Sequence, residues 1–168
     1  MQNSMRKIRV EKVVLNIGCA GDMEKIERAK KLLENLTGRK AFVTKSKRRS
    51  TFGIAKGKPI GTIVTLRKKQ AIEFLKKALE AVGNRLSIKQ FDVEGNFSFG
   101  IKEYIDIPGV RYQPEIGILG LDVCVSLERP GFRIKRRGVR KGKIPKEHRI
   151  SKEEAIEWVK KEFGVKVE

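Results

Sequence analysis

Apolar and polar residues alternate along several short stretches of the chain, the pattern of half-buried β-strands. Val13, Leu15 and Ile17 fall on one face of a strand expected over residues 9–17, with Asn16 on the other. The same alternation predicts four further strands, over residues 41–45, 60–67, 91–99 and 121–128. The first two of these flank one loop and are expected to form an extended hairpin around it.

Three other stretches repeat apolar residues at spacings of three and four, which is typical of amphipathic helices. The first follows a capping residue, Asp22, and ends at Gly38. The second covers residues 70–82. The third begins at a capping box formed by Ser151 and Glu154. Each helix therefore has one apolar side that must pack against the strands.

This succession predicts a single α+β domain over residues 1–168, with two layers: helices cover one face of a mixed, largely antiparallel sheet, and the other face stays open. Polar residues of the strands belong to that open face, where their side chains either hydrogen-bond to sugar and phosphate or simply meet solvent. They are Asn16, Thr44, Thr65, Ser98 and Ser126.

Three segments rich in glycine, proline or charge are expected to be mobile loops, at about residues 45–58, 103–119 and 129–148. A loop as long as 103–119 in a compact domain usually has a function. In the first loop, Phe52 stands alone among charges. It is suited equally to stacking on a base or ribose and to anchoring the loop on the body.

Positive charge is concentrated in two segments without a single acidic residue. The chain has 39 Lys and Arg against 20 Asp and Glu. Eleven of the basic residues lie in residues 39–69 and nine in residues 129–146. Without these twenty the remainder has 19 basic and 20 acidic residues, a net charge of −1. A nearly neutral body with two cationic segments indicates binding to phosphates, although solvated loops are the simpler reading.

Signals for catalysis, metal and cofactor are weak. The segment at residues 53–58 lacks the spacing and the Ser or Thr of a nucleotide-binding loop. His148 is the only histidine, and Cys19 and Cys124 form no motif. We therefore expect no cofactor, no metal and no enzymatic activity. Without an apolar run of signal-peptide or membrane-spanning length, we expect a cytoplasmic protein that does not contact membrane.

Two alternatives to a structural RNA-binding protein stay open at this point. One is an RNA-processing enzyme whose metal ions are held by scattered acids, Glu103, Asp106, Asp122 and Glu128. The other is an RNA chaperone without a fixed partner. Exposed aromatic pairs are missing from the predicted sheet face, which argues against recognition by splayed and stacked bases. Shape and backbone recognition of a folded RNA fits better.

Four segments resemble the universal 5S rRNA-binding protein family of the large ribosomal subunit, fifth in the bacterial large-subunit list, in an archaeal-type form. They are RVEKVVLNIG at residues 9–18, LTGRKAFVTKSKRRSTFGIAKGKPIGTIVTLR at residues 36–67, GNFSFGIKEYIDIPGVRY at residues 95–112 and GILGLDVCVSLERPG at residues 117–131. The resemblance covers most of the chain. It implies a ribosome-bound protein of the central protuberance.

The resemblance also implies roles for particular residues. Those expected to hold 5S rRNA are Asn16, Thr44, Lys45, Lys47, Arg48, Thr65 and Arg67. Those expected near the P-site tRNA are Arg49, Ser50, Thr51, Phe52, Gly53, Lys56, Gly57 and Lys58. Those expected to reach small-subunit head protein number thirteen, in a bridge between subunits, are Pro108, Gly109, Val110, Arg111, Tyr112 and Gln113.

The sequence departs from the bacterial form of this family in three places. Against that form, we expect the first strand to lie close to the start of this sequence, without the bacterial helical extension before it, and the loop on the tRNA side to be one residue shorter. Residues 129–146 have no bacterial counterpart. We expect this basic segment to contact large-subunit rRNA or another protein of the central protuberance. The residues concerned are Arg133, Lys135, Arg136, Arg137, Arg140 and Lys141.

Overall fold

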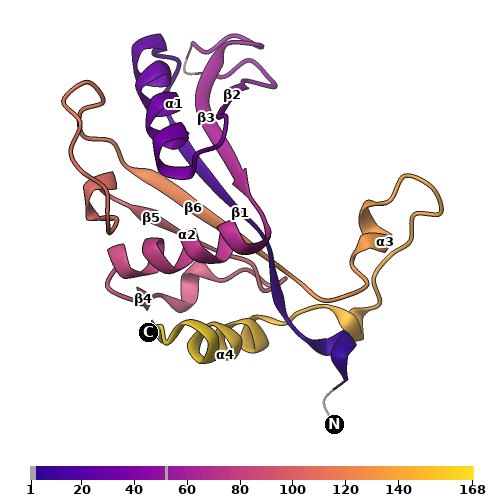
Figure 1. Ribbon diagram of the computed structural model, residues 1–168. Coiled ribbons are helices and arrows are strands. Elements are labelled where there is room, and N and C mark those ends of the chain that lie inside the picture. Colours follow the sequence, from indigo (N-terminus) through magenta and orange to yellow (C-terminus); the bar gives the residue numbers. More distant parts are fainter. Residues whose placement is uncertain (1–2, 52) are drawn as a thin grey trace.

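The computed structural model describes residues 3–51 and 53–168 and contains a five-stranded antiparallel sheet (Figure 1). In spatial order the strands are β2 (Phe42–Lys45), β3 (Pro59–Leu66), β1 (Arg9–Gly18), β6 (Leu121–Glu128) and β5 (Phe97–Ile101). The helices are α1 (Met23–Thr37), α2 (Lys68–Ala81), α3 (Arg133–Arg136) and α4 (Lys152–Phe163). The predicted α+β class and largely antiparallel sheet are confirmed.

Helices α1 and α2 pack on one face of the sheet, α1 against β3 and α2 against β1. The apolar alternation of β1 explains this, because Val13 and Leu15 are fully buried beneath the helices. Burying an aliphatic side chain of this size stabilises the fold by about 1.5–3 kcal/mol. Among the described residues, no layer comparable to α1 and α2 covers the opposite face of the sheet.

Two of the three predicted helices begin at the caps that the sequence indicated, whereas α2 begins two residues before the predicted start at residue 70 and has no side-chain cap. Asp22 accepts hydrogen bonds from the backbone N–H groups of Glu24 and Lys25, at 3.1 and 3.4 Å. Helix α1 ends at Gly38, whose φ of 64° few other residues adopt readily. The capping box of Ser151 and Glu154 starts α4 as the sequence indicated. Local sequence therefore determines where these helices begin and end.

The strand predicted over residues 91–99 is partly wrong. The structure has β5 only from Phe97. The predicted alternation places Val93 on the same inner face as Phe97 and Phe99, but Val93 is 83% exposed. A tight turn interrupts the alternation, with the Gly95 N–H donating to the Asp92 carbonyl. Gly95 has a φ of +76°, and a Cβ there would lie 2.7 Å from Ile150. Both the backbone conformation and the packing thus require glycine.

A second, two-stranded sheet was not predicted. It pairs β4 (Arg85–Leu86) with β7 (Lys166–Val167) in parallel. Two-residue strands are too short to produce a visible alternation. Short 3-10 turns complete the chain, at Ser4–Arg6, Ile88–Gln90, Tyr104–Asp106 and Lys146–His148. Among the described residues, none of the helices has the length and apolarity needed to cross a membrane.

Candidate nucleic-acid interface

The open face of the sheet collects the polar side chains that the alternation predicted for it. Residues directly opposite each other in antiparallel strands share a face. Val14 of β1 pairs with Thr65 of β3, and Thr65 is half-buried. Two positions further along β1, Asn16 faces Ile63. These register pairs place Thr65 and Asn16 together on the side away from the helices.

The same reasoning places the other three predicted residues. Thr44 of β2 pairs with Gly61 of β3, two positions from Ile63. Ser126 of β6 pairs with Lys12, two positions before Val14, and Ser98 of β5 pairs with Cys124. The prediction that all five residues share the open face is therefore confirmed. Their role in binding RNA stays a prediction.

Thr44 can lie close to the sheet because the residue opposite it has no side chain. A Cβ on Gly61 would lie 2.5 Å from the Ile17 carbonyl oxygen and 3.4 Å from Thr44 Oγ1. Such close contact with a backbone atom would force β1 and β3 apart. Gly61 thus allows a close approach of the strands beside the Thr44 hydroxyl.

Two further residues of this face were not identified from the sequence. Lys12 lies on the open side of β1, and Phe42 of β2 is 66% exposed and shares a face with Ile63. The signal was present, because Lys12 and Phe42 lie four and two residues before Asn16 and Thr44. A cation and an aromatic ring are the groups that contact phosphate and base.

The loop between β2 and β3 continues the hairpin beyond the sheet (Figure 1). Backbone hydrogen bonds join Ser46 to Lys58 and to Gly57, each at 2.8 Å, and Ser50 to Ile54 at 2.9 Å. The side chain of Lys58 lies beside Gly21, at the base of the loop. Phe52 lies outside the described residues. The remaining predicted residues of the loop and its base are exposed or, for Ser50, half-buried: Lys45, Lys47, Arg48, Arg49, Ser50, Thr51, Gly53, Lys56 and Gly57.

The loop over residues 103–119 is anchored by a buried tyrosine. Tyr104 is fully buried, and its hydroxyl accepts a hydrogen bond from the Gln113 backbone N–H at 2.9 Å. The Gln113 side chain in turn accepts from Asn35 of α1 at 3.1 Å. The predicted stretch between them is presented outward, with Gly109, Arg111, Tyr112 and Gln113 exposed and Pro108 and Val110 half-buried. This loop lies at the same end of the sheet as the β2–β3 loop.

Residues 129–150, which we call the basic arm, project from the opposite end of the sheet (Figure 1). Arg136 of α3 joins the arm to the strands through two carboxylates, Glu11 and Glu128, each at 2.5 Å. Arg9 also pairs with Glu128, at 2.7 Å, and Arg67 lies 3.7 Å from Glu11. This network commits Arg136 to holding the arm in place.

A second arginine of the arm is buried. Arg129 is 4% exposed, and its guanidinium donates to the Arg149 carbonyl and to Glu154, at 3.1 and 2.8 Å. Burial alone raises the pKa of the Glu154 carboxyl. Hydrogen bonds from the Ser151 N–H and from Arg129, together with the Arg129 charge, outweigh it and hold that pKa below its ordinary value. Arg129 is therefore internally paired, although it counted toward the basic segment in the sequence.

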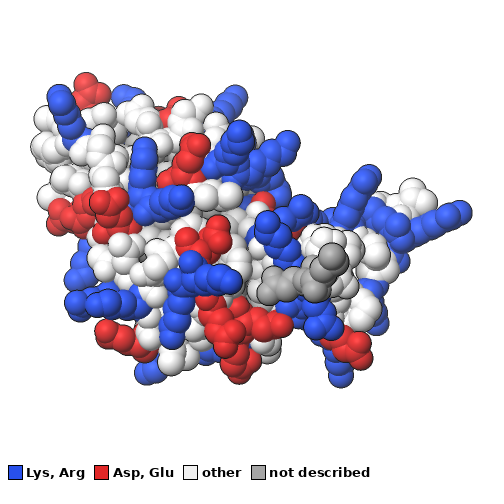
Figure 2. Space-filling view, turned by 60° about the horizontal axis from the view of Figure 1, so that its bottom comes forward, with Lys and Arg blue, Asp and Glu red and all other residues white. Residues whose placement is uncertain are grey.

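The remaining cations of the arm stay at its surface. Figure 2 shows Lys and Arg dominating the projecting arm, whereas the facing part of the body mixes basic and acidic side chains. Of the six residues predicted to make additional contacts, Arg136 forms two ion pairs. The other five are exposed on the arm and none of them forms two ion pairs with described residues: Arg133, Lys135, Arg137, Arg140 and Lys141.

The described residues contain no group of three or more His, Cys, Asp and Glu that could hold a metal ion. Both cysteines are free, and only Cys19 is buried, as expected of a small hydrophobic residue. Cys124 is instead exposed on the open face. Desolvation by the neighbouring atoms, and then the Asp122 carboxylate, raises the pKa of its thiol.

Comparison with known proteins adds independent information. A family model described as "Ribosomal protein L5" matches residues 3–54, and a second model, which describes the C-terminus of the same ribosomal family, matches residues 59–158. The large ribosomal subunit protein uL5 of Sulfurisphaera tokodaii is 53% identical over 167 residues, 98% of this chain and 94% of that protein. The uL5 proteins of Pyrobaculum aerophilum and Nanoarchaeum equitans are 49% and 47% identical, covering 98% and 99% of this chain and 92% and 99% of their own.

Proposed function

The chain belongs to the ribosomal protein L5 family of the large ribosomal subunit, and on this premise we propose that it binds 5S rRNA through its open sheet face. Members of this family are structural ribosomal proteins rather than enzymes. The observation that carries the proposal is the gathering of Asn16, Thr44 and Thr65 on one helix-free face. That face holds the RNA in the central protuberance of a cytoplasmic ribosome.

Chemistry supports a folded RNA as the ligand of this face. Hydroxyl and amide groups hydrogen-bond to ribose and phosphate oxygens, while cations at the strand ends neutralise the backbone. Lys45, Lys47, Arg48 and Arg67 are exposed around the face, and Lys12 adds a fifth cation on it. Phe42 is the single described aromatic residue exposed on the five strands, so stacking of successive bases is not the main mode.

The two loops at the far end of the sheet serve other partners. The tip over residues 49–58 approaches the P-site tRNA, since it extends beyond the sheet and is rich in cations. The outward stretch over residues 108–113 reaches small-subunit head protein number thirteen. The basic arm contacts large-subunit rRNA, with neighbouring central-protuberance proteins beside it. The two ends of the sheet thereby contact different parts of the ribosome.

A filter-binding titration of the full chain tests this function. Five cations on or around the open face predict that log K falls with log salt concentration at a slope of about −4. We expect 5S rRNA to bind at least about tenfold more tightly than an unrelated RNA duplex of equal length. Equal affinity for the two RNAs at every salt concentration would contradict the proposed function.

A further inference from the structure

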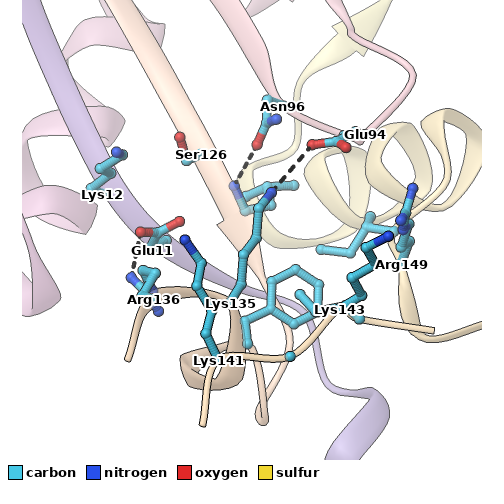
Figure 3. A pocket seen from close by; sticks show the side chains of 15 residues that line it. Glu11, Lys12, Glu94, Asn96, Ser126, Lys135, Arg136, Lys141, Lys143 and Arg149 are labelled. Carbon is cyan, nitrogen blue, oxygen red and sulfur yellow. Dashed lines mark hydrogen bonds and ion pairs between the residues drawn. The ribbon is translucent and has the colours of Figure 1, made fainter. Parts of the chain in front are cut away.

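A hollow of about 890 Å³ separates the basic arm from the strands (Figure 3). One wall belongs to the open sheet face, with Lys12 of β1 and Ser126 of β6. Asn96 comes from the turn before β5, and Phe132 and Lys141 belong to the arm. A space of this size holds a small ligand or a single residue of a polymer, but not a nucleic-acid duplex.

Cations around this hollow outnumber its acids by six to two. The acids, Glu11 and Glu94, both form ion pairs with the arm, Glu11 with Arg136 and Glu94 with Lys135. The Lys135 pair is long, at 3.9 Å, and solvent-exposed, so it holds the ammonium only weakly. Four cations of the wall form no ion pair with any described residue: Lys12, Lys141, Lys143 and Arg149. The hollow therefore offers unneutralised charge to an anion.

Phe132 adds an aromatic surface whose position is fixed. Its ring is half-buried and meets the His148 ring edge-on, with centroids 5.8 Å apart. His148 is itself held by a 2.8 Å contact between Nε2 and the Pro130 carbonyl. A ring fixed beside a ligand space can stack on a nucleobase without a further loss of side-chain freedom.

Polar groups complete the wall. The Asn96 Oδ1 accepts the Leu127 N–H at 3.2 Å, which orients the amide and leaves its NH₂ group available as a donor. The Ser126 hydroxyl lies on the neighbouring strand. In Figure 3, Lys135 and Lys141 extend from the arm toward these strands. A base edge or a ribose 2′-hydroxyl in the hollow would find both donors and acceptors.

We propose that this hollow binds one unstacked nucleotide of an RNA strand, with Phe132 stacking on the base and Lys12, Lys141 and Lys143 on the flanking phosphates. The proposal rests on the proposed function, because Lys12 and Ser126 belong to the open face that receives RNA. An RNA strand crossing that face toward the arm reaches the hollow without a break. The arm thereby acts as a nucleotide-binding element in addition to a source of charge.

The test is fluorescence anisotropy with two labelled five-residue oligoribonucleotides of equal charge. One is abasic except for a central adenosine, and the other is abasic throughout. Stacking of a base on an aromatic side chain predicts that the wild-type chain prefers the adenosine strand by about fivefold or more. Phe132→Leu should abolish this preference while leaving affinity for the abasic strand unchanged, and Phe132→Tyr should retain it.

Charge is tested by a matched pair of double variants. Lys141→Ala/Lys143→Ala should lower the affinity for both oligonucleotides by about tenfold or more relative to the control Lys76→Ala/Lys77→Ala. The control removes two exposed lysines from helix α2. Equal effects of the two double variants would contradict the proposal. So would a Phe132→Leu protein that keeps the adenosine preference, or adenosine 5′-monophosphate binding as tightly as the strand. These readouts do not depend on 5S rRNA selectivity, so the proposed function can fail separately.

Discussion

Replacing Glu128 by Gln should loosen the basic arm and destabilise the fold together. The Glu128 side chain is 8% exposed and receives three guanidinium contacts, from Arg9 Nε at 2.9 Å, Arg9 Nη2 at 2.7 Å and Arg136 Nη2 at 2.5 Å. A hydrogen bond to a charged group contributes about 1.5–3 kcal/mol when shielded from water. The Arg9 and Arg136 side chains are 59% and 44% exposed, so water can replace most of the hydrogen bonding that each guanidinium loses when the Glu128 carboxylate is removed.

Because water compensates the two arginines in this way, we expect the loss of the three contacts to lower the free energy of unfolding by about 2 kcal/mol in all. For a chain of this size each kcal/mol lowers Tm by about 2–4 °C, so the melting temperature should fall by about 4–8 °C. Circular dichroism measures it. Hydrogen exchange adds a local readout at the Arg137 amide, which donates to the Arg133 carbonyl at 3.0 Å at the end of α3.

The matched control is Glu147→Gln. Glu147 is exposed on the same arm, forms no ion pair with the described residues, and its replacement changes net charge equally. In Glu128→Gln the Arg137 amide hydrogen should exchange faster than in the control, and the protein should melt at a lower temperature. Identical Tm values and exchange rates in the two variants would refute the account of Arg136 as the residue that holds the arm.

Three further substitutions test the packing and electrostatics of the same body. Thr62 is fully buried and its hydroxyl has no hydrogen-bond partner among the described residues, so Thr62→Val should raise the free energy of unfolding by about 1 kcal/mol. A lower free energy of unfolding than that of wild type, measured by urea denaturation, would contradict this. Gly61→Ala should cost about 1–3 kcal/mol because its Cβ meets the Ile17 carbonyl, and unchanged stability would contradict the close strand approach. Glu154→Gln should be less stable than wild type by about 1 kcal/mol at neutral pH. The folded-state pKa of Glu154 is depressed, so this stabilisation is present above the ordinary value of 4.5 and is lost as pH falls through the folded-state pKa. The difference in free energy of unfolding between wild type and Glu154→Gln should therefore disappear in acid. A difference that stays constant with pH would argue against the pairing with Arg129.

The layered fold could be predicted from sequence because its elements are long and regular. Strand β1 has ten residues and alternates clearly from Val13 to Ile17, the apolar stripe of α1 persists over more than ten residues, and caps such as Asp22 and Ser151 mark helix starts. Alternation also placed Thr44 correctly, on a strand of four residues. The same rule misassigned Val93, because the turn at Gly95 happens to lie between two alternating segments.

What the sequence could not show are contacts between distant residues. Arg129 and Arg136 look like their neighbours in the basic segment, yet one pairs with Glu154 and the other with Glu11 and Glu128. No local pattern relates positions 11 and 136, so only the folded chain shows which cations are already neutralised. The hollow beside Phe132 has the same origin, since the arm and the sheet form its two sides.

The central claim is that the open sheet face, not the loop tip, holds 5S rRNA. Its most direct test compares 5S rRNA affinity of the triple variant Asn16→Ala/Thr44→Ala/Thr65→Ala with that of Lys56→Ala/Lys58→Ala, by filter binding at fixed salt. Three lost hydrogen bonds of about 1 kcal/mol each predict a roughly hundredfold weaker complex for the first variant and wild-type affinity for the second. Loss of binding in the loop variant with wild-type affinity in the triple variant would contradict the account.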